Sequence, residues 1–505
     1  MRLRYQKFGL NFFAPAKRDA ADAAELAELV SPSTDHISVG IILVPVETTD
    51  RNRAPNLLPV TLILAVVFWL FTMTGGGDIF VKEVLGGAYD SQAEHFLRGD
   101  VGVDSDAIAH ETMSVNGKVR MYFGPFPALL RIPLNLIYPP GHGKWSRISG
   151  FCAGIIALFA FAGLVQTALR SSPLSSRARN WIGNACVIGF ALGSPLLLLL
   201  GNLSIYDEAI IWGFAWSLAA LYFAWRSRIN EGAALTRSLL AFSLCAGAAL
   251  LARATFGVPF VLITPLLAIR LFHRRPIRNM TALFLPLGIA LVFFLFLSYA
   301  KFGDFSGMPM KYNINPVQRD FAVKHGLFRL ERVPYSFADY FVLRSPKPQR
   351  EAPFLKANRI DYYPKAALYV MPFTETYSSL LWSSSWILLG AIIGVVMLLR
   401  PGGADGVERL IAAIFLVQVI PILSFMGLCQ RYIADLFPFL VFAFLIFLRQ
   451  GKIAFQLRYL LIALVVVSVV INSLTTVSWL IEADMNVPTE TRAKWDQFLG
   501  RTSRS

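Results

Sequence analysis

Residues 89–133 read YDSQAEHFLRGDVGVDSDAIAHETMSVNGKVRMYFGPFPALLRIP, and they decide how this chain is organised. They follow a long apolar run at 57–74 and contain six acids: Asp90, Glu94, Asp100, Asp104, Asp106 and Glu111. The Asn-Gly pair is a turn signal, and the aromatic segment YFGPFP then leads back to apolar sequence. The stretch therefore predicts an acidic loop held against a bundle of membrane helices.

The composition is that of an integral membrane protein. Of the 505 residues, 55% are hydrophobic and only 16% are charged, whereas soluble domains average about a quarter charged residues. Several apolar runs approach the roughly 20 residues that a helix needs to cross a bilayer. We expect spans at 57–74, 148–169, 181–201, 205–225, 238–252, 255–272, 281–300, 380–399, 407–428, 432–448 and 458–480. The expected fold is an all-α polytopic membrane protein with about 11 transmembrane helices.

Basic residues divide the connections between these spans into two sets. One set holds Arg170, Arg177, Arg179, Arg226, Arg228, Arg237, Arg270, Arg274, Arg275, Arg278, Arg400, Arg409, Arg449, Lys452 and Arg458. The other short connections, at 202–204 and 253–254, hold only Arg253. The positive-inside rule places the first set in the cytoplasm. We therefore expect a cytoplasmic tail at 1–56, a transmembrane domain at 57–480, extracytoplasmic loops at 75–147 (loop one) and 301–379 (loop two), and an extracytoplasmic tail at 481–505.

The short apolar segment at 127–138, the first span and the four cysteines each require their own interpretation. Residues 127–138 are apolar but short, and they contain Arg131 and two prolines. They could cross the membrane, but we expect a helix along its outer surface, because a further span would move the arginines at 170–179 outside. No cleavable signal peptide is evident, so the first span is expected to be an uncleaved anchor. The four cysteines lack a paired spacing and are read as small core residues: Cys152, Cys186, Cys245 and Cys429.

Asp90 and Glu111 are the two acids of loop one whose positions are most specific. Asp90 closely follows the first span in YDSQAEHFL, a short amphipathic helix whose Ala93, Phe96 and Leu97 would face the membrane. Glu111 precedes the turn and the aromatic segment that returns to the bilayer. The other four acids are more simply read as solvated.

Loop two is basic and rich in tyrosine. Its cations and rings include Lys311, Tyr312, Arg319, Lys324, Arg329, Arg332, Tyr335, Tyr340, Arg344, Lys347, Arg350, Lys356, Arg359, Tyr362 and Tyr363. Cations suit a phosphate and ring faces suit a sugar, while contact with anionic lipid headgroups is the alternative. Nucleic acid is not expected outside a membrane, so the net charge of +15 is not read as a DNA-binding signal.

Ionisable groups in or beside spans are rare, and they mark functional sites by default. Arg253 interrupts LLARATFG at an outer turn, and Arg431 and Asp435 lie at the outer end of a span in CQRYIADLFPF. Tyr206 and Glu208 begin another span in GNLSIYDEAII. An Arg431–Asp435 pair at i, i+4 that only stabilises the bundle is the structural alternative. The sequence contains no HExxH, GxSxG, P-loop or Cys/His metal motif.

The order of these features resembles the GT-C superfamily of polytopic glycosyltransferases, which includes family-39, protein O-mannosyltransferase-like and aminoarabinose-transferase-like enzymes. The resemblance rests on YDSQAEHFLRGD after the first span, NGKVRMYFGPFPALLRIP before the second, YDEAI opening the fourth, AKFGDFSGMPMKY after the seventh and RYIADLFP at the tenth. It implies transfer of a sugar, with inversion, from a polyprenyl-phosphate donor to an extracytoplasmic glycan, lipid or protein, at a bacterial inner membrane.

The resemblance also implies roles for particular residues. Asp90 is expected to be the general base with Glu111 in support, and the two could share a divalent cation, Mg²⁺ or Mn²⁺. Arg431 and Arg253 are expected to bind the donor phosphate. The expected substrate-binding residues are Tyr122, Tyr206, Glu208, Tyr312 and Asp435.

Two other classes of function stay open. A transporter or flippase of lipid-linked saccharides would carry ionisable groups near the middle of its spans and often an inverted repeat, and the sequence shows neither. A non-catalytic scaffold would leave unexplained why Asp90, Glu111, Arg253 and Arg431 fall on one side of the predicted bundle.

Overall fold

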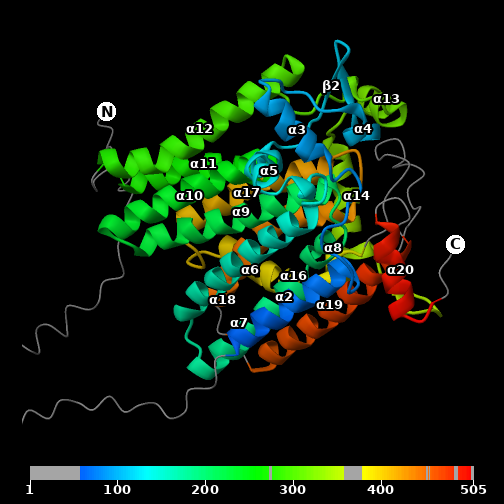
Figure 1. The fold of residues 1–505 in the computed structure, drawn as a ribbon. Coiled ribbons are helices and arrows are strands. Elements are labelled where there is room, and N and C mark those ends of the chain that lie inside the picture. The colour runs from blue at the N-terminus through cyan, green and yellow to red at the C-terminus, as the bar shows by residue number, and fades with distance from the viewer. Residues whose placement is uncertain are drawn as a thin grey trace, which may run out of the picture. The chain divides into compact units, whose positions relative to one another are not determined.

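The computed structural model describes residues 57–271, 276–357, 378–450, 453, 455–482 and 487–501. The predicted tail at 1–56 and the part of loop two at 358–377 lie outside these residues. Long helices make up most of the described chain (Figure 1). They are α2 (Leu58–Thr74), α6 (Ser146–Arg170), α7 (Ser176–Leu192), α8 (Pro195–Gly201), α9 (Ile205–Ile229), α10 (Gly232–Ala252), α11 (Ala254–Leu271), α12 (Pro276–Phe302), α16 (Ser385–Leu399), α17 (Gly406–Ser424), α18 (Ile433–Gln450) and α19 (Phe455–Glu482). The all-α membrane fold predicted from the sequence is confirmed.

Each predicted span corresponds to a helical segment of the structure. Eight helical segments of the described chain are long and apolar enough to cross a membrane. The remaining three predicted spans correspond to the shorter apolar helices α2, α11 and α16. The third predicted span consists of α7 and α8, which are separated at Ser194 because Pro195 has no backbone N–H with which to continue a helix. The number of about 11 crossings stays a prediction.

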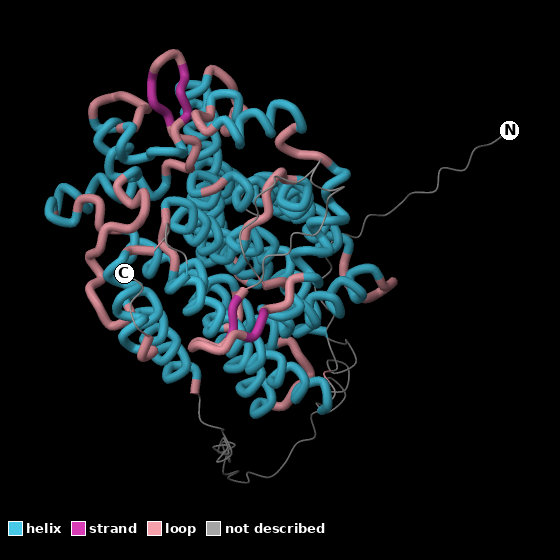
Figure 2. The backbone as a smooth tube through the Cα atoms, turned by 90° about the vertical axis from the view of Figure 1, so that its right-hand side faces the viewer, coloured by secondary structure: helices cyan, strands magenta, loops and turns pink. Residues whose placement is uncertain are grey.

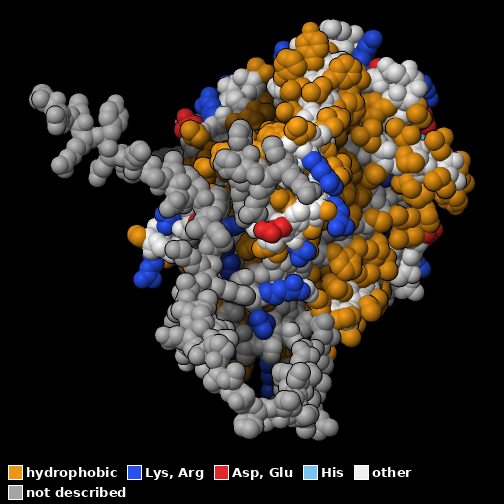
Figure 3. All heavy atoms as spheres, turned by 90° about the vertical axis from the view of Figure 1, so that its left-hand side faces the viewer, with side chains coloured by type: hydrophobic (Ala, Val, Ile, Leu, Met, Phe, Trp, Pro, Cys, Tyr) orange, Lys and Arg blue, Asp and Glu red, His pale blue; other side chains and the backbone are white. Residues whose placement is uncertain are grey.

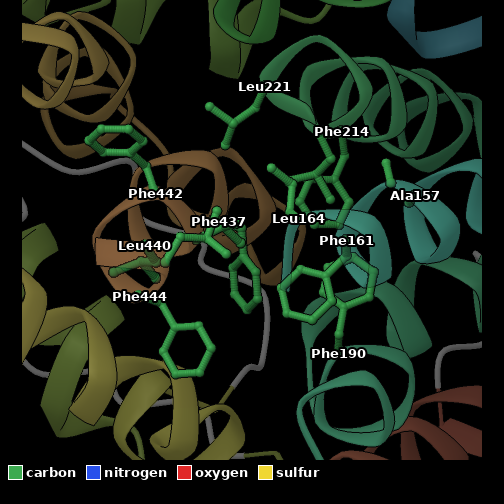
Figure 4. Close-up of a cluster of buried hydrophobic side chains, with 14 of the residues drawn as sticks. Ala157, Phe161, Leu164, Phe190, Phe214, Leu221, Phe437, Leu440, Phe442 and Phe444 are labelled. Carbon is green, nitrogen blue, oxygen red and sulfur yellow. The ribbon is translucent and has the colours of Figure 1, made fainter. Parts of the chain in front are cut away.

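Aromatic side chains fill the centre of the bundle (Figure 4). Phe161 of α6 stacks on Phe190 of α7, with ring centroids 4.2 Å apart. Helix α18 is enclosed on nearly all sides, and its Phe444 packs edge-on against Trp386 of α16. A Cβ atom at Gly394 of α16 would collide with the backbone of α18. Small residues at such contacts let membrane helices approach closely, and the gain in packing stabilises the bundle.

The two ends of the bundle differ in chemistry. Figure 2 faces the end where loops and two short hairpins gather, and Figure 3 faces the opposite end, where Lys and Arg side chains lie among hydrophobic ones. At that opposite end Glu408 of α17 accepts hydrogen bonds from Arg449 at 2.5 Å and from Arg228 at 3.0 Å. These ion pairs connect α9, α17 and α18. Three of the arginine-rich connections predicted to share one side, those after α9, α16 and α18, therefore meet at one end.

Loop one folds into short elements at the other end. They are α3 (Ala88–Leu97), α4 (Ser105–Ile108), η1 (Ala109–Glu111), β1 (Met113–Val115), β2 (Lys118–Arg120), α5 (Phe126–Ile137) and η2 (Pro139–Gly141). The predicted Asn-Gly turn joins β1 to β2, with φ of 51° at Asn116 and 75° at Gly117. Positive φ at both central residues is what a two-residue hairpin turn requires, and Asn and Gly tolerate it best.

Helix α5 corresponds to the apolar segment that was predicted to lie along the membrane surface. It packs against α3, α9 and α10, with Ala128 and Arg131 buried. Its last turn exposes Leu136 and Ile137, which are 72% and 80% exposed. One buried face and one exposed apolar end suit a helix at a membrane surface, and its position in the bilayer stays a prediction.

Loop two packs directly on loop one. Its described elements are η3 (Met310–Tyr312), α13 (Pro316–His325), η4 (Leu330–Arg332), α14 (Val333–Ala338), the π-helical η5 (Asp339–Leu343), β3 (Lys347–Pro348) and β4 (Leu355–Lys356). Two further short helices, α15 (Leu380–Ser383) and η7 (Gln430–Tyr432), come later in the chain. Met113 of β1 forms a β-bridge with Asn313, and the Ile314 N–H donates to the Thr112 carbonyl at 3.1 Å. Residue Glu111 is therefore fixed beside loop two.

The segment predicted to be a C-terminal tail forms a packed helix, α20 (Thr489–Phe498). Its Trp495 packs edge-on against Phe71 and donates its indole N–H to the Thr72 carbonyl of α2 at 3.3 Å. The buried Arg147 guanidinium binds both Glu83 of loop one, at 2.5 Å, and Thr491 of α20, at 2.6 Å. The C-terminal helix thus lies at the same end of the bundle as loop one, as the predicted topology requires.

Cysteine labelling tests which end faces the outside. In a background without the four native cysteines, Val115→Cys and His325→Cys should react with a membrane-impermeant maleimide on intact cells. Ala233→Cys should react only after permeabilisation, because the α9–α10 turn belongs to the arginine-rich end. Ala233 is preferred to Gly232, whose φ of 55° strains other residues. The reverse pattern of labelling would overturn the predicted orientation.

Candidate functional site

A cavity of about 290 Å³ lies at the end of the bundle where the loops gather. Its wall comes from the ends of α9, α12 and α17, the turn between α10 and α11, the η7 segment before α18, and both loops. The polar side chains in this wall are Glu111, Tyr122, Tyr206, Arg253, Thr255, Ser298, Lys301, Ser306, Gln318, Arg431 and Tyr432. Aromatic and methionine side chains form much of the rest. Five residues predicted from sequence therefore meet in one cavity: Glu111, Tyr122, Tyr206, Arg253 and Arg431.

Glu111 is the only acid in the described part of this wall, and its side chain is held tightly. It is 3% exposed. The Tyr122 hydroxyl donates to its Oε2 at 2.9 Å, and the Tyr206 hydroxyl donates to its Oε1 at 2.5 Å. Burial and the neighbouring carboxylate raise the pKa of the Tyr122 phenol well above its usual value, so this phenol remains a proton donor at neutral pH. The two phenols fix both carboxylate oxygens of Glu111 at the cavity.

Arg253 is oriented by a carboxylate behind it. The fully buried Asp435 accepts a hydrogen bond from Arg253 Nε at 3.0 Å and another from the Thr255 hydroxyl at 2.5 Å. Asp435 itself does not line the cavity, so its predicted place as a substrate-binding residue is corrected: it acts through Arg253. The Arg431–Asp435 pair considered as a structural alternative is also corrected, because Asp435 pairs with Arg253 instead.

Arg431 is oriented by aromatic rings. Its guanidinium lies 4.4 Å from the centroid of the Tyr206 ring and 5.6 Å from that of Tyr432. Arg253 lies 5.3 Å from the same Tyr432 ring, so this ring contacts both guanidinium groups. A cation over an aromatic face is attracted by the negative potential of the ring. Tyr206 thus contacts both Arg431 and Glu111, and it connects the acidic and basic parts of the wall.

Asp90, the expected general base, does not line the cavity. Helix α3 turns Asp90 inward, where it is fully buried, and Asn135 donates to its Oδ1 at 2.8 Å. Arg131 Nε lies 3.5 Å from Asp90 Oδ2, and Arg131 Nη2 donates to Glu208 at 2.6 Å. Glu208, predicted to bind substrate, is therefore buried too, and neither acid lines the cavity. The physical reason is the buried Arg131 guanidinium, which requires nearby carboxylates in a medium that solvates charge poorly.

The residues present do not form the divalent-cation site considered from the sequence. Asp90 is paired with Arg131, whereas both oxygens of Glu111 accept phenol hydrogen bonds. Within the described ranges no group of three or more His, Cys, Asp or Glu side chains has the geometry to hold a metal ion.

Tyr312 was predicted from the sequence to bind substrate, whereas Lys301 was not predicted as a site residue. Tyr312 lies on η3 beside the cavity, but only its neighbour Met310 is part of the wall. Lys301 is in the wall and is 5% exposed. It follows the apolar run of α12 and is the first residue of the predicted loop two. An ionisable residue at the last turn of a span was the signal that could have identified it.

This arrangement provides one proton acceptor and several fixed cations around an aromatic space. The Glu111 carboxylate can accept a proton from a hydroxyl. Arg253 and Arg431 can stabilise a phosphate on which negative charge develops. The aromatic wall can pack against a sugar ring or an isoprenoid chain.

No family model matches the chain, and no curated protein matches it. Two solved structures are similar to it in fold. The apo oligosaccharyltransferase of Archaeoglobus fulgidus is 13% identical with a TM-score of 0.48, covering 88% of this chain and 60% of that one. Apo ArnT of Cupriavidus metallidurans is 12% identical with a TM-score of 0.33, covering 87% of this chain and 84% of that one. This chain thus spans less than two thirds of the oligosaccharyltransferase. At these identities the likeness concerns the fold alone.

Proposed function

We propose that this protein is a membrane glycosyltransferase that transfers a sugar from a polyprenyl-phosphate donor to a hydroxyl of an extracytoplasmic glycan, lipid or protein. The observation that carries the proposal is the cavity, in which one buried carboxylate, Glu111, faces a space shared with Arg253 and Arg431. A proton acceptor and phosphate-binding cations are the two elements that this reaction requires.

The donor would bind with its phosphate at the two arginines and its prenyl chain along α12. Phe294 and Leu297 of α12 line the cavity. On the same helix Ile289, Val292 and Phe296 are 62%, 67% and 60% exposed and apolar. An isoprenoid chain lying on this face would lead its phosphate into the cavity.

The chemistry is a single displacement. Glu111 accepts the proton of the acceptor hydroxyl, and the oxygen attacks the anomeric carbon. The bond between that carbon and the phosphate oxygen breaks, and the prenyl phosphate leaves with the electron pair, which inverts the anomeric centre. Tyr122 and Tyr206 hold Glu111 in place, and Asp435 holds Arg253. Fixed donors around a leaving phosphate stabilise the charge that develops in the transition state.

The arginine-rich end of the bundle supports an extracytoplasmic location for the cavity. This end would face the cytoplasm by the positive-inside rule, which leaves the loops and the cavity on the outer side of a bacterial inner membrane. A lipid-linked donor suits this location, since soluble nucleotide sugars are cytoplasmic.

A reconstitution experiment distinguishes the proposal from a flippase. Membranes of a strain that lacks the protein are fused with vesicles containing wild-type or Glu111→Gln protein, and lipid-linked sugars and glycans are measured by mass spectrometry. We expect only the wild type to consume a prenyl-phosphate sugar and form a glycosylated product. Equal restoration by both proteins would reject the proposal, because the proposed transfer requires the Glu111 carboxylate as proton acceptor.

Arg431 is predicted to bind the donor phosphate. Arg431→Ala should weaken binding of farnesyl phosphate to the purified protein in nanodiscs by roughly 10- to 100-fold, the usual size of a lost charged hydrogen bond. Arg431→Lys should lose less, because it retains the charge but not the planar fork. Arg319→Ala is the control, since Arg319 is a partly exposed residue of α13 that pairs with Asp320 and does not line the cavity. Unchanged affinity in both Arg431 variants would assign this residue a purely structural role.

A further inference from the structure

Lys301 is a buried cation that has no anionic partner within the described part of the chain. Its side chain is 5% exposed and lines the cavity from the last turn of α12. The charged group with the strongest influence on it is Arg120, which carries the same charge. Lys301 therefore differs from the fully buried arginines, which all have partners: Arg131 with Glu208, Arg147 with Glu83, Arg344 with Asp339 and Arg332 with backbone carbonyls.

A buried ammonium without a counter-charge is costly. Proteins keep such groups in membrane segments mainly where they bind a substrate or ion. Among the residues that the structure describes, the acids near the cavity already have other partners, because Asp435 pairs with Arg253 and Glu111 accepts two phenols. The anion that would balance Lys301 is therefore expected to come from a bound molecule.

Lys301 comes from α12, whereas Arg253 comes from the turn between α10 and α11 and Arg431 from η7. Arg253 and Arg431 contact the same ring, that of Tyr432. Lys301 lies in the last turn of α12, close in sequence to Ser298 of the same helix. The Ser298 hydroxyl accepts a hydrogen bond from the Gly307 N–H and donates one to the Asp304 carbonyl. This turn connects the end of α12 to loop two and supports the wall around Lys301.

We propose that Lys301 forms a second anion subsite of the cavity, which binds a phosphate or carboxylate of the substrate other than the phosphate held by Arg253 and Arg431. This inference rests on the proposed function. The substrate would then carry two anionic groups near the reacting carbon. The second group is either the outer phosphate of a diphosphate-linked donor or a carboxylate on the sugar.

Two pairs of probes separate these sources. Farnesyl diphosphate is compared with farnesyl phosphate, and glucuronic acid 1-phosphate with glucose 1-phosphate, on the full-length protein in nanodiscs. We expect the wild type to prefer the doubly anionic member of one pair by about 10- to 100-fold, the contribution of one charged hydrogen bond. A preference in the first pair identifies a diphosphate, and a preference in the second identifies an acidic sugar.

Variants then test whether Lys301 causes the preference. Lys301→Met should abolish it while leaving the affinity for farnesyl phosphate unchanged, and Lys301→Arg should keep it. Lys311→Met is the matched control, because Lys311 is an exposed lysine of the same loop that does not line the cavity. Lys301→Met should also unfold at the same or a higher temperature than the wild type, since it removes an unbalanced buried charge.

Three results would overturn the subsite: no preference in either pair, a preference that survives Lys301→Met, or an equal loss of farnesyl phosphate binding in that variant. The last result would mean that Lys301 holds the same phosphate as the arginines. Failure of the proposed function is distinguishable. In that case the wild type would not bind farnesyl phosphate, whereas pyrophosphate would still bind in a manner that depends on Lys301.

Discussion

Glu111→Gln should lower the rate of sugar transfer by about 10²- to 10⁴-fold, the usual contribution of a positioned general base. The amide retains the shape of the side chain but cannot accept the proton of the acceptor hydroxyl. The affinity for farnesyl phosphate should stay nearly unchanged, because the phosphate is expected at Arg253 and Arg431. Single-turnover rates and donor binding, measured on the same preparation, separate the two effects.

Two further variants control this result. Tyr122→Phe removes one hydrogen bond to Glu111 but keeps the carboxylate, so it should lower the rate by only about 10-fold, the value of a typical hydrogen bond. Asp90→Asn should keep most of the activity, because Asp90 is buried against Arg131 and does not line the cavity. If Asp90→Asn reduced transfer as strongly as Glu111→Gln in a protein of normal stability, the base would have to be reassigned to Asp90.

Arg131→Ala should destabilise the fold by about 3 to 5 kcal/mol, the usual cost of removing one partner of a buried ion pair. Arg131 is fully buried and is shared by Asp90 and Glu208. Its loss would leave two carboxylates together without a cation. Unfolding of the purified protein, followed by tryptophan fluorescence in a denaturant titration, measures the change.

Charge-balanced variants show whether the effect is electrostatic. Asp90→Asn alone should cost less than Arg131→Ala, since Arg131 and Glu208 remain a neutral pair at 2.6 Å. The triple variant Arg131→Met, Asp90→Asn, Glu208→Gln should recover much of the stability, because replacing a whole buried ion cluster is far milder than breaking it. A change within 1 kcal/mol for Arg131→Ala would show that the cluster contributes little to the fold.

The same cluster explains how the cavity acquires its geometry. Glu208 and Tyr206 lie in the first turn of α9, and Arg131 attaches this turn to α5 and α3. Tyr206 then reaches both Glu111 and Arg431. A loosened cluster should therefore also misplace the carboxylate, so partly active Arg131 variants should lose more turnover than donor affinity.

Local sequence patterns determined much of this protein. Uninterrupted apolar runs determined the long helices, because a membrane helix satisfies its own backbone hydrogen bonds and needs only apolar side chains around it. The Asn-Gly pair determined the β1–β2 turn, since its φ values are a property of those residues. The position of Glu111 in loop one, and of Arg253 and Arg431 beside the ends of spans, was also sufficient to predict that they share one end of the bundle.

Only the tertiary structure decided which of these residues face the cavity. A helical pattern cannot reveal that α3 turns Asp90 toward Arg131, because that contact joins residues of different helices. The choice of Arg253 rather than Arg431 as the partner of Asp435 likewise depends on how α11 meets α18, far apart in sequence. The lack of an anionic partner for Lys301 among the described residues could be recognised only after their acids were located in space. Charge pairing in a medium of low dielectric is decided by distances in space, and those distances are set by the packing of the whole bundle.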